Sequence, residues 1–344
     1  MGYQVGMIEA LSFPRHQIGE SLSSGVWNIF EYLNATTLLE KDTYIHNLPA
    51  QVIWETPSPI DIKAEQRGQS VVVDRGILDQ DLLALAVERG LQLWQPAKLN
   101  SCKKIKEQWQ VQFQCQKTTH SLSTTIVLDA RGRKGIKLKE RYQTAPTSIS
   151  VYTHLPQGSM PFVTSIEAVD FGWIWGSPLP NKQYRVMGFV DPELVKKIPV
   201  EQVLLFLAQR STLFKRIIPY LSKATQHTCS VLNYTHQNPW QLGYIHIGEA
   251  AFSLDPLSSS GVEKAMRFSL QTTIAINTLL KTGQRAVAQS FYEQKIIDAV
   301  ATHTTWTKNY YETVWAPKNL PFWHQRINYS LPIATEKTPF ISQL

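Results

Sequence analysis

The spacing of apolar residues along the chain changes repeatedly between the helical period and the strand period. Over 78–90 the apolar side chains share one helical face, with Asp79 placed to cap the first turn and Gly90 to end the last. Over 108–115 apolar residues alternate with glutamines, which predicts a half-buried strand. A long helix is expected over 262–282. The interleaved pattern indicates an α/β core with β-rich insertions.

Three short apolar runs, at 4–9, 125–128 and 244–247, predict further strands. The last of them breaks at Gly248, and a loop follows. From about residue 285 onward the chain is helical in pattern and rich in aromatic residues, which we interpret as packing against the main body.

The composition is that of a globular protein large enough for two domains, or for one with insertions. The 344 residues are 43% hydrophobic and 18% charged, which excludes a disordered chain and a coiled coil. No apolar run approaches the ~18 residues of a membrane span and no signal peptide is visible, so a cytoplasmic location is expected. The three cysteines lie far apart, so no structural metal is expected. The net charge of +7 is dispersed, which favours a solvated surface over nucleic-acid binding.

The segment from Gly248 to Gly261 carries the strongest chemical signal. It reads G-E-A-A-F-S-L-D-P-L-S-S-S-G and lies between an expected strand and a long helix. Small residues let backbone amides approach a ligand, and a helix N-terminus favours a phosphate or another anion. We interpret the segment as a cradle for an anion or a cofactor. The alternative is an ordinary connection between a strand and a helix.

This segment resembles one in FAD-dependent monooxygenases of the p-hydroxybenzoate hydroxylase type, and in their flavin-dependent halogenase-like branch. The family pattern is G-D-A-A-x-x-x-x-P-x-x-x-x-G, which holds the ribityl chain and turns the helix start toward the isoalloxazine ring. Glutamate takes the place of the aspartate here. The resemblance implies FAD as the cofactor and the following binding residues: Gly248, Glu249, Pro256, Ser259, Ser260 and Gly261.

Other segments resemble the same family. Residues 73–79 are similar to its D-R-x-x-(F/L)-D stretch near the flavin, residues 128–133 to its D-A-(T/S)-G-R stretch, and residues 18–21 to the halogenase-like G-E-(S/A) turn. The carboxylate that ends the first strand stands where the family binds the adenosine ribose. These matches add four candidates for cofactor binding: Glu9, Glu20, Arg75 and Asp129.

Two indole side chains are candidates for the wall of a substrate pocket. Residues 172–178, G-W-I-W-G-S-P, resemble the halogenase W-x-W-x-I-P motif, with Ser177 in place of isoleucine. Trp173 and Trp175 share one face of the expected strand, where they either wall a tunnel between flavin and substrate or belong to the core. Residues 322–326 are similar to the F-W-x-x-R end of the same branch.

The resemblance implies an α/β fold in which a Rossmann-like FAD-binding domain is interleaved with a β-sheet substrate domain and followed by C-terminal helices. We assign the FAD-binding domain to 1–45, 74–100, 124–145 and 238–284. The β-rich substrate domain is assigned to 46–73, 101–123 and 146–237, and the C-terminal helical region to 285–344.

Two features depart from the family pattern. The strand, G-x-G-x-x-G turn and helix that bind the FAD pyrophosphate are missing, so the Rossmann-like domain is expected to be N-terminally incomplete by roughly thirty residues. Either Met1 is internal to a longer reading frame or the chain is a remnant that binds FAD poorly. The lysine that halogenases use is also missing near Trp54, and only Lys41 precedes that position. Halide transfer is therefore disfavoured, although Ser259–Gly261 resembles the chloride-binding turn.

The resemblance implies a monooxygenase that hydroxylates an aromatic substrate, free or protein-bound and of tryptophan type in one option, through a flavin C4a-hydroperoxide. No nicotinamide-binding fingerprint is visible, so a separate flavin reductase is the expected partner. The first alternative is a flavin-dependent halogenase. The alternative of another class is a non-catalytic remnant whose exposed sheet edge pairs with another chain. For a general base the sequence offers only candidates by residue type: His16, His46 and His246.

Overall fold

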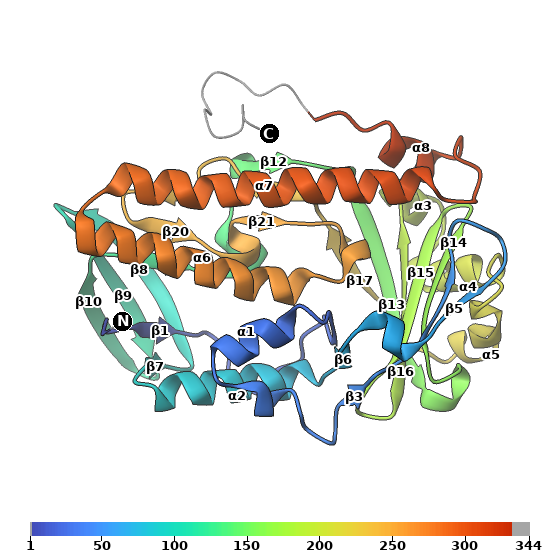
Figure 1. Cartoon of the computed structure of the whole chain (residues 1–344), viewed down its shortest axis with the longest axis horizontal. Helices are drawn as coiled ribbons and strands as arrows, with labels where there is room; N and C mark the ends of the chain where they lie inside the picture. The colour runs from blue at the N-terminus through green and yellow to red at the C-terminus, as the bar shows by residue number, and fades with distance from the viewer. Residues whose placement is uncertain (1, 332–344) are drawn as a thin grey trace.

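The computed structural model describes residues 2–331, which form two β-sheet regions side by side (Figure 1). The long helices α6 (Gly261–Thr282) and α7 (Arg285–Glu312) lie next to each other across the region on the left of Figure 1. Met1 lies outside the described residues, and so does 332–344, the end of the predicted C-terminal helical region.

A seven-stranded sheet forms the region on the right of Figure 1. Its strand order is β17-β13-β16-β15-β14-β4-β5, and all neighbours are antiparallel except β14 and β4. The strands are β4 (Ala50–Ile53), β5 (Ile60–Ile62), β13 (Ser148–Pro156), β14 (Thr164–Val169), β15 (Gly172–Pro178), β16 (Gln183–Val190) and β17 (His227–Val231). Alternate residues of each strand point to opposite faces of the sheet.

One face of this sheet is covered by α3 (Pro192–Lys197), α4 (Val200–Ala208) and α5 (Ile218–Leu221). Val186 of β16 and Leu204 of α4 are completely buried in the core between them. Burial of each such side chain stabilises the fold by roughly 1.5–3 kcal/mol, so this face is a packing surface.

The opposite face of the sheet packs against a cluster of buried aromatic side chains. Trp173 is buried and stacks on Phe189, with ring centroids 3.8 Å apart. Trp323 of α8 (Pro321–Ile327) closes this core and donates its Nε1–H to the carbonyl of Val169 over 3.0 Å. The predicted C-terminal helices therefore pack on the sheet, and they do so at one end of it.

Two short parallel ladders lie among the strands on the left of Figure 1. In the first, β1 (Gly6–Ile8) pairs with β7 (Gln92–Trp94). In the second, β11 (Val127–Asp129) pairs with β20 (Tyr244–His246), which also pairs antiparallel with β19 (Trp240–Gln241). Within residues 2–331 no strand pairs with the second edge of β1 or of β11.

The open edges of β1 and β11 border the same apolar cluster. Ile8 and Val127 both pack into it. Leu128 nevertheless remains 43% exposed, which is unusual for a strand of a parallel sheet. The described residues thus contain two separate parallel ladders that border one apolar cluster.

An antiparallel meander packs beside these ladders. It consists of β8 (Ala97–Ile105), β9 (Gln108–Cys115) and β10 (Thr118–Thr124). Its buried Phe113 contacts Trp94 of β7, with ring centroids 5.1 Å apart. The apolar face of the meander is covered by the ladders, and the assignment of 101–123 to the substrate domain stays a prediction. The other domain boundaries stay a prediction.

Two three-stranded sheets and two further helices complete the described fold. The strands are β2 (Ser21–Leu22), β6 (Val71–Val72) and β3 (Ile45–His46) in one sheet, and β12 (Arg141–Gln143), β18 (Tyr234–His236) and β21 (Phe252–Ser253) in the other. The helices are α1 (Val26–Tyr32) and α2 (Arg75–Glu88).

Helix α2 begins three residues before the predicted start because Asp74 caps it. The Asp74 side chain accepts the Ile77 backbone N–H over 3.1 Å. Asp79, the predicted cap, instead binds Arg75 one turn earlier through both carboxylate oxygens. The predicted end is confirmed, since Gly90 follows the helix with a φ of +97°.

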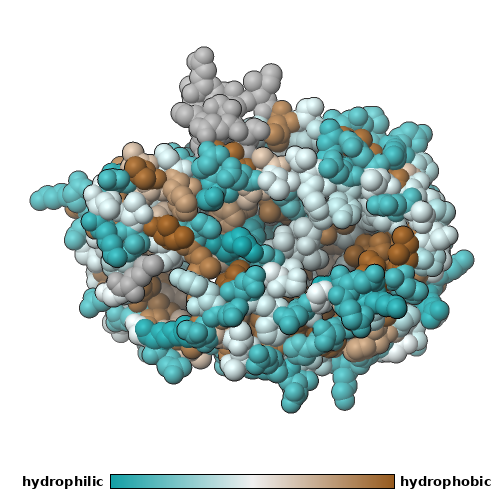
Figure 2. Space-filling view, in the orientation of Figure 1, coloured by the Kyte–Doolittle hydropathy of each residue, from teal (hydrophilic) through white to brown (hydrophobic). Residues whose placement is uncertain are grey.

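The face of the molecule in Figure 2 is mainly hydrophilic, with hydrophobic residues in small separate patches. Exposed apolar side chains on α6 and α7 include Ile274, Leu280 and Val287. Within residues 2–331 no helix has both the length and the apolar character needed to cross a membrane. The same part of the chain contains no group of three or more His, Cys, Asp or Glu side chains arranged to hold a metal ion.

Candidate functional site

The predicted cradle consists of two short helical turns between β20 and α6. The first turn is Gly248–Ala250 and the second is Pro256–Ser258. Gly248 has a φ of +59° and Ser259 a φ of +50°, so the backbone reverses direction at both positions. Left-handed conformations are unstrained for glycine and uncommon for serine, which indicates that the turn after Ser258 is imposed by its surroundings.

Asp255 supplies much of that constraint. Its buried carboxylate accepts the Leu257 backbone N–H over 3.0 Å, the Tyr311 hydroxyl over 3.0 Å and the Asn233 side-chain amide over 3.3 Å. Burial and the Asp255 charge raise the pKa of Tyr311 well above its usual value, so this hydroxyl remains a donor. These bonds attach the second turn to α7 and to the segment before β18.

Lys264 holds the cradle from the side of α6. Its Nζ donates to the carbonyl of Phe252 over 2.6 Å and lies 4.4 Å from the centre of the Phe252 ring. Burial lowers the pKa of this amine to about 8. The first turn of α6 is therefore bonded directly to β21, the strand between the two turns.

The start of α6 is open. A Cβ atom built on Gly261 meets no atom within 4 Å. Ser260 precedes the helix without capping it, because its hydroxyl bonds the hydroxyl of Ser258 over 2.7 Å. The first-turn amides thus lack a side-chain cap and carry the positive end of the helix dipole, which suits an anion or the polar edge of a ring.

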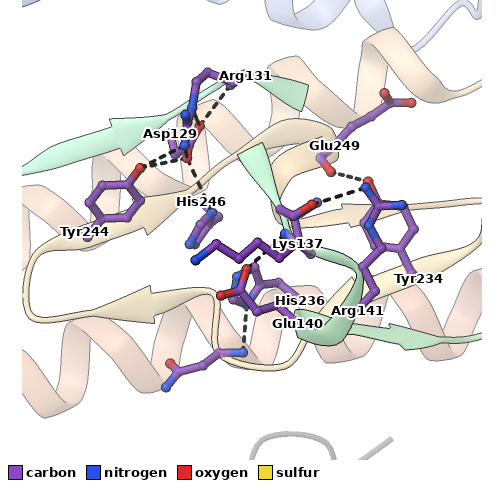
Figure 3. A network of polar contacts seen from close by, with 12 residues as sticks. Asp129, Arg131, Lys137, Glu140, Arg141, Tyr234, His236, Tyr244, His246 and Glu249 are labelled. Carbon is purple, nitrogen blue, oxygen red and sulfur yellow. Dashed lines mark hydrogen bonds and ion pairs between the residues drawn. The ribbon is translucent and has the colours of Figure 1, made fainter. Parts of the chain in front are cut away.

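A second predicted residue, Asp129, lies at the end of β11 in a polar cluster (Figure 3). Its buried carboxylate forms an ion pair with Arg131 at 2.5 Å and accepts the Tyr244 hydroxyl over 2.7 Å. Burial opposes the charge, but these hydrogen bonds prevail and lower the pKa of Asp129. With its oxygens engaged by the protein, Asp129 holds the end of β11 in place.

Two stacked imidazoles lie beside Asp129. The rings of His236 and His246 are 4.1 Å apart between centroids, and Nδ1 of His246 is 3.9 Å from the Asp129 carboxylate (Figure 3). Burial lowers the pKa of both, to about 4 for His236. His236 accepts the Asn238 N–H through Nδ1, so its Nε2 carries the proton and has no partner in the described part of the chain. His246, a candidate base, is therefore enclosed by the protein.

Two further predicted carboxylates, Glu249 and Glu9, lie apart from each other. The Glu249 side chain is half exposed beside Arg133, 3.7 Å away, while its backbone carbonyl accepts the Tyr234 hydroxyl. Glu9 ends β1 on the other ladder and accepts the Leu11 N–H over 2.8 Å. Both carboxylates reach solvent, and their predicted contacts with FAD stay predictions.

A cleft of about 450 Å³ opens beside β13 and β16 of the seven-stranded sheet. It lies between that sheet, the loop before β2 and the start of α2. Its lining residues are His16, Gln17, Glu20, Val73, Asp74, Arg75, Gly76, Tyr152, His154, Leu179, Pro180, Asn181, Gln183, Arg185 and His227. Its volume is in the range of small-molecule sites.

An ion pair between Glu20 and Arg185 forms the base of the cleft. Both side chains are at least nine-tenths buried. Glu20 also accepts the Gly19 N–H over 3.0 Å, and Arg75 donates to the carbonyls of Ile18 and Gly19. The structure thus brings two of the predicted residues, Glu20 and Arg75, to one turn, and a Cβ on Gly19 would lie 3.7 Å from Val262 of α6. The cleft and the cradle are therefore neighbours.

Two histidines contact Arg185 in the cleft. Its guanidinium lies 2.5 Å from Nε2 of His154 through Nη2 and 3.1 Å through Nε, and Nη2 lies 3.4 Å from Nε2 of His16. Burial and the arginine charge lower the pKa of His154 to about 4, so it is neutral near pH 7. Of the three histidines that the sequence offered as a general base, only His16 lines the cleft. His154 and Arg185 are new, and the long-range pairing of β13 with β16 brings them together.

Other predicted residues lie elsewhere. Trp173 belongs to the aromatic core, and Trp175 packs at the edge of the same cluster; neither lines the cleft. Lys41 forms an ion pair with Asp81 of α2, and no lysine is among the residues that line the cleft. His46 lies on β3 outside the cleft, near the carbonyl of Lys41.

The described residues fit one end of an FAD molecule. The open, uncapped start of α6 and its two rigid turns offer amides to a polar ring edge or a ribityl hydroxyl. The Rossmann-type glycine turn for the pyrophosphate has no counterpart in the sequence.

Comparison with known proteins decides the family. The model of the family described as tryptophan halogenase matches residues 55–339, which is most of the chain. The chain belongs to the tryptophan halogenase family. Membership confirms the family resemblance and its class, FAD-dependent oxidoreductases, read from the cradle and the Asp74-Arg75 segment.

Individual members of the family are distant. The chain is 26% identical over 323 residues to a tryptophan 2-halogenase from Chondromyces crocatus. The matched region covers 85% of this chain and 60% of the relative. The chain therefore spans about three fifths of the length of that relative.

Solved structures confirm the fold class. The myxobacterial chondrochloren halogenase CndH, an FAD-dependent halogenase, superposes with a TM-score of 0.82 at 22% identity, covering 98% of this chain and 82% of CndH. The peptidyl tryptophan dihydroxylase QhpG, which is essential for tryptophylquinone cofactor biogenesis, gives 0.78 at 20% identity, covering 97% and 76%. At these identities the likeness concerns the fold alone.

Proposed function

We propose that this protein is an FAD-dependent monooxygenase that hydroxylates an aromatic substrate. The observation that carries the proposal is the rigid, uncapped start of α6 at Gly261, next to a cleft that contains no lysine. FAD held at Gly248, Glu249 and the 256–261 turn would supply the redox chemistry that activates dioxygen. A separate flavin reductase would deliver the reducing equivalents.

In this proposal the chain positions the substrate and keeps water away from it. Asp255 fixes the second turn of the cradle and Lys264 bonds the first turn of α6 to β21, so the amides there need no rearrangement when the ligand binds. Glu20 and Arg185 fix the turn that separates the cradle from the cleft. Leu179, Pro180 and the ring of Tyr152 offer an apolar wall for an arene.

Halogenation is the second candidate. The family model and the anion-compatible start of α6 favour it. Against it stands the position of Lys41, which is paired with Asp81 away from the cleft. Both reactions oxidise an arene, so the products distinguish them: hydroxylation adds one oxygen atom and halogenation replaces a hydrogen by a halogen.

A flavin-binding experiment tests the cradle. We expect Gly261→Val to weaken FAD binding at least tenfold, because a branched side chain would fill the space in front of the α6 amides. Gly158→Val is the matched control, since a Cβ there also meets no atom within 4 Å but the residue lies in the turn after β13. Equal FAD affinity in both variants, measured by quenching of flavin fluorescence, would refute the cradle.

The reaction is tested with reduced FAD supplied by a flavin reductase, dioxygen and indole-containing substrates, with and without chloride. Mass spectrometry of the products should show an added oxygen under both conditions. A chlorinated product would instead establish the second candidate. Absence of any product together with absence of bound flavin would favour the non-catalytic alternative.

A further inference from the structure

The hydrogen bonds of Arg185 fix the tautomer of two cleft histidines. A guanidinium has five N–H donors and no acceptor, so a ring nitrogen bonded to it must accept. Nε2 of His154 and Nε2 of His16 both face Arg185. In its neutral form each ring therefore carries its proton on Nδ1.

The Nδ1–H of His154 is available to a ligand. Within residues 2–331 it has no hydrogen-bond partner in the protein, and it is not among the buried polar atoms left without one. His154 lines the cleft, and Nδ1 is the ring nitrogen that Arg185 leaves free. His16 lines the same cleft with its own Nδ1–H, and its ring meets that of His154 edge to face.

The charges around the cleft select the kind of acceptor. Arg185 is neutralised by Glu20, and Arg75 by Asp79. Asp74 remains, with a carboxylate that caps α2. His227 and Tyr152 complete the set of titratable side chains that line the cleft. Among these carboxylates and guanidiniums the balance leaves one excess negative charge, which disfavours a carboxylate ligand. The N–H donor of His154 therefore favours an uncharged oxygen as its acceptor.

We propose that His154, with His16 beside it, recognises a neutral carbonyl oxygen next to the arene of the substrate. The inference rests on the proposed function and narrows its substrate class to aryl compounds that carry an amide or peptide carbonyl. Arg185 is the positioning residue, because it holds both rings with their Nδ1–H groups free.

Four indole probes test the proposal: indole-3-acetamide, indole-3-acetate, tryptamine and indole. Binding is measured by calorimetry on the protein as purified and again with FAD added. We expect the acetamide to bind about tenfold tighter than indole, the size of one well-formed hydrogen bond to a preorganised donor. Tightest binding of the acetate or of tryptamine, or equal binding of all four, would overturn the proposal.

Two variants isolate the donor. His154→Gln keeps an oxygen that accepts from Arg185 but removes the donor at the Nδ1 position, so the ratio of indole-3-acetamide affinity to indole affinity should fall from about ten to about one. His46→Gln is the control, since His46 lies outside the cleft, and it should retain the preference. A preference that persists in His154→Gln contradicts the assignment.

Nitrogen NMR of the histidine rings gives a readout that does not depend on turnover or on flavin. At pH 7 the His154 ring should show an unprotonated Nε2 and a protonated Nδ1. Addition of indole-3-acetamide should shift only the Nδ1 signal. A proton on Nε2 of His154 would overturn the proposal. If the tautomer and the amide preference hold but no flavin binds, the proposed function fails and the recognition site stands.

Discussion

Two clusters in this protein contain the same chemical groups in different arrangements. The cleft cluster comprises Glu20, Arg185, His16 and His154. There the arginine lies between the carboxylate and the imidazoles, so it binds both and leaves the far side of each ring free. The result is a set of N–H donors that face a cleft.

The Asp129 cluster comprises Asp129, Arg131, Tyr244, His236 and His246 (Figure 3). Here the carboxylate is central, and it is the acceptor for the arginine and the tyrosine. The imidazoles stack on each other and are enclosed. The comparison teaches that the group at the centre of a cluster decides what the cluster does. A central arginine accepts no hydrogen bond and leaves the imidazole N–H groups free, whereas a central carboxylate accepts the available N–H and O–H groups and so holds two strands together.

The largest expected effect is a difference in unfolding free energy between variants of Arg185 and Arg131. Arg185→Met leaves the buried Glu20 carboxylate without its charged partner and should lower the free energy of unfolding by about 3–5 kcal/mol. Arg131→Met should cost only about 1 kcal/mol, because its side chain is 52% exposed and Asp129 keeps the Tyr244 hydroxyl and a backbone amide. Urea unfolding of both variants measures the difference. Equal losses would mean that burial does not distinguish the clusters.

Much of the fold follows from local patterns in the sequence. The helix at 262–282, the strand at 108–115 and the strand before Gly248 are confirmed because each has a strong period and a clear end. The start of α2 was misplaced because Asp74 and Asp79 are both plausible caps, and only the geometry shows which one faces a free N–H.

The site was predictable only in part. Motifs identified Glu20 and Arg75, which the structure brings to one turn. The partners Arg185 and His154 gave no signal, because they become neighbours only through the pairing of β13 with β16. Alternation along β13 places Tyr152 and His154 on the same face, but it does not tell which end of the sheet opens to a cleft.

The second expected effect concerns pH. His236 and His154 have pKa values of about 4 in the folded state, below the usual value of about 6.5, because burial disfavours their charged forms. As pH falls from 6.5 to 4 the unfolded chain takes up protons first, so folding stability is present above pH 6.5 and decreases through this window.

Variants assign this decrease to each cluster. His236 is 4% exposed and should contribute on the order of 1–3 kcal/mol, and His154, which is only half-buried, should contribute less because solvent screens its charge. His236→Asn, which keeps an acceptor for Asn238, should flatten the profile of unfolding free energy against pH more than His154→Gln does. The reverse order would assign the acid sensitivity to the cleft cluster.

The smallest expected effect compares two tyrosines. Tyr244→Phe removes a donor to the buried Asp129 carboxylate, 2.7 Å away, and should cost about 1 kcal/mol, because Arg131 continues to bind that carboxylate. Tyr152→Phe should change the free energy of unfolding by less than about 0.5 kcal/mol, since the Tyr152 hydroxyl has no hydrogen-bond partner within residues 2–331. Thermal unfolding of the two variants provides the measurement. A larger loss for Tyr152→Phe would show that the Tyr152 hydroxyl is bonded within the protein.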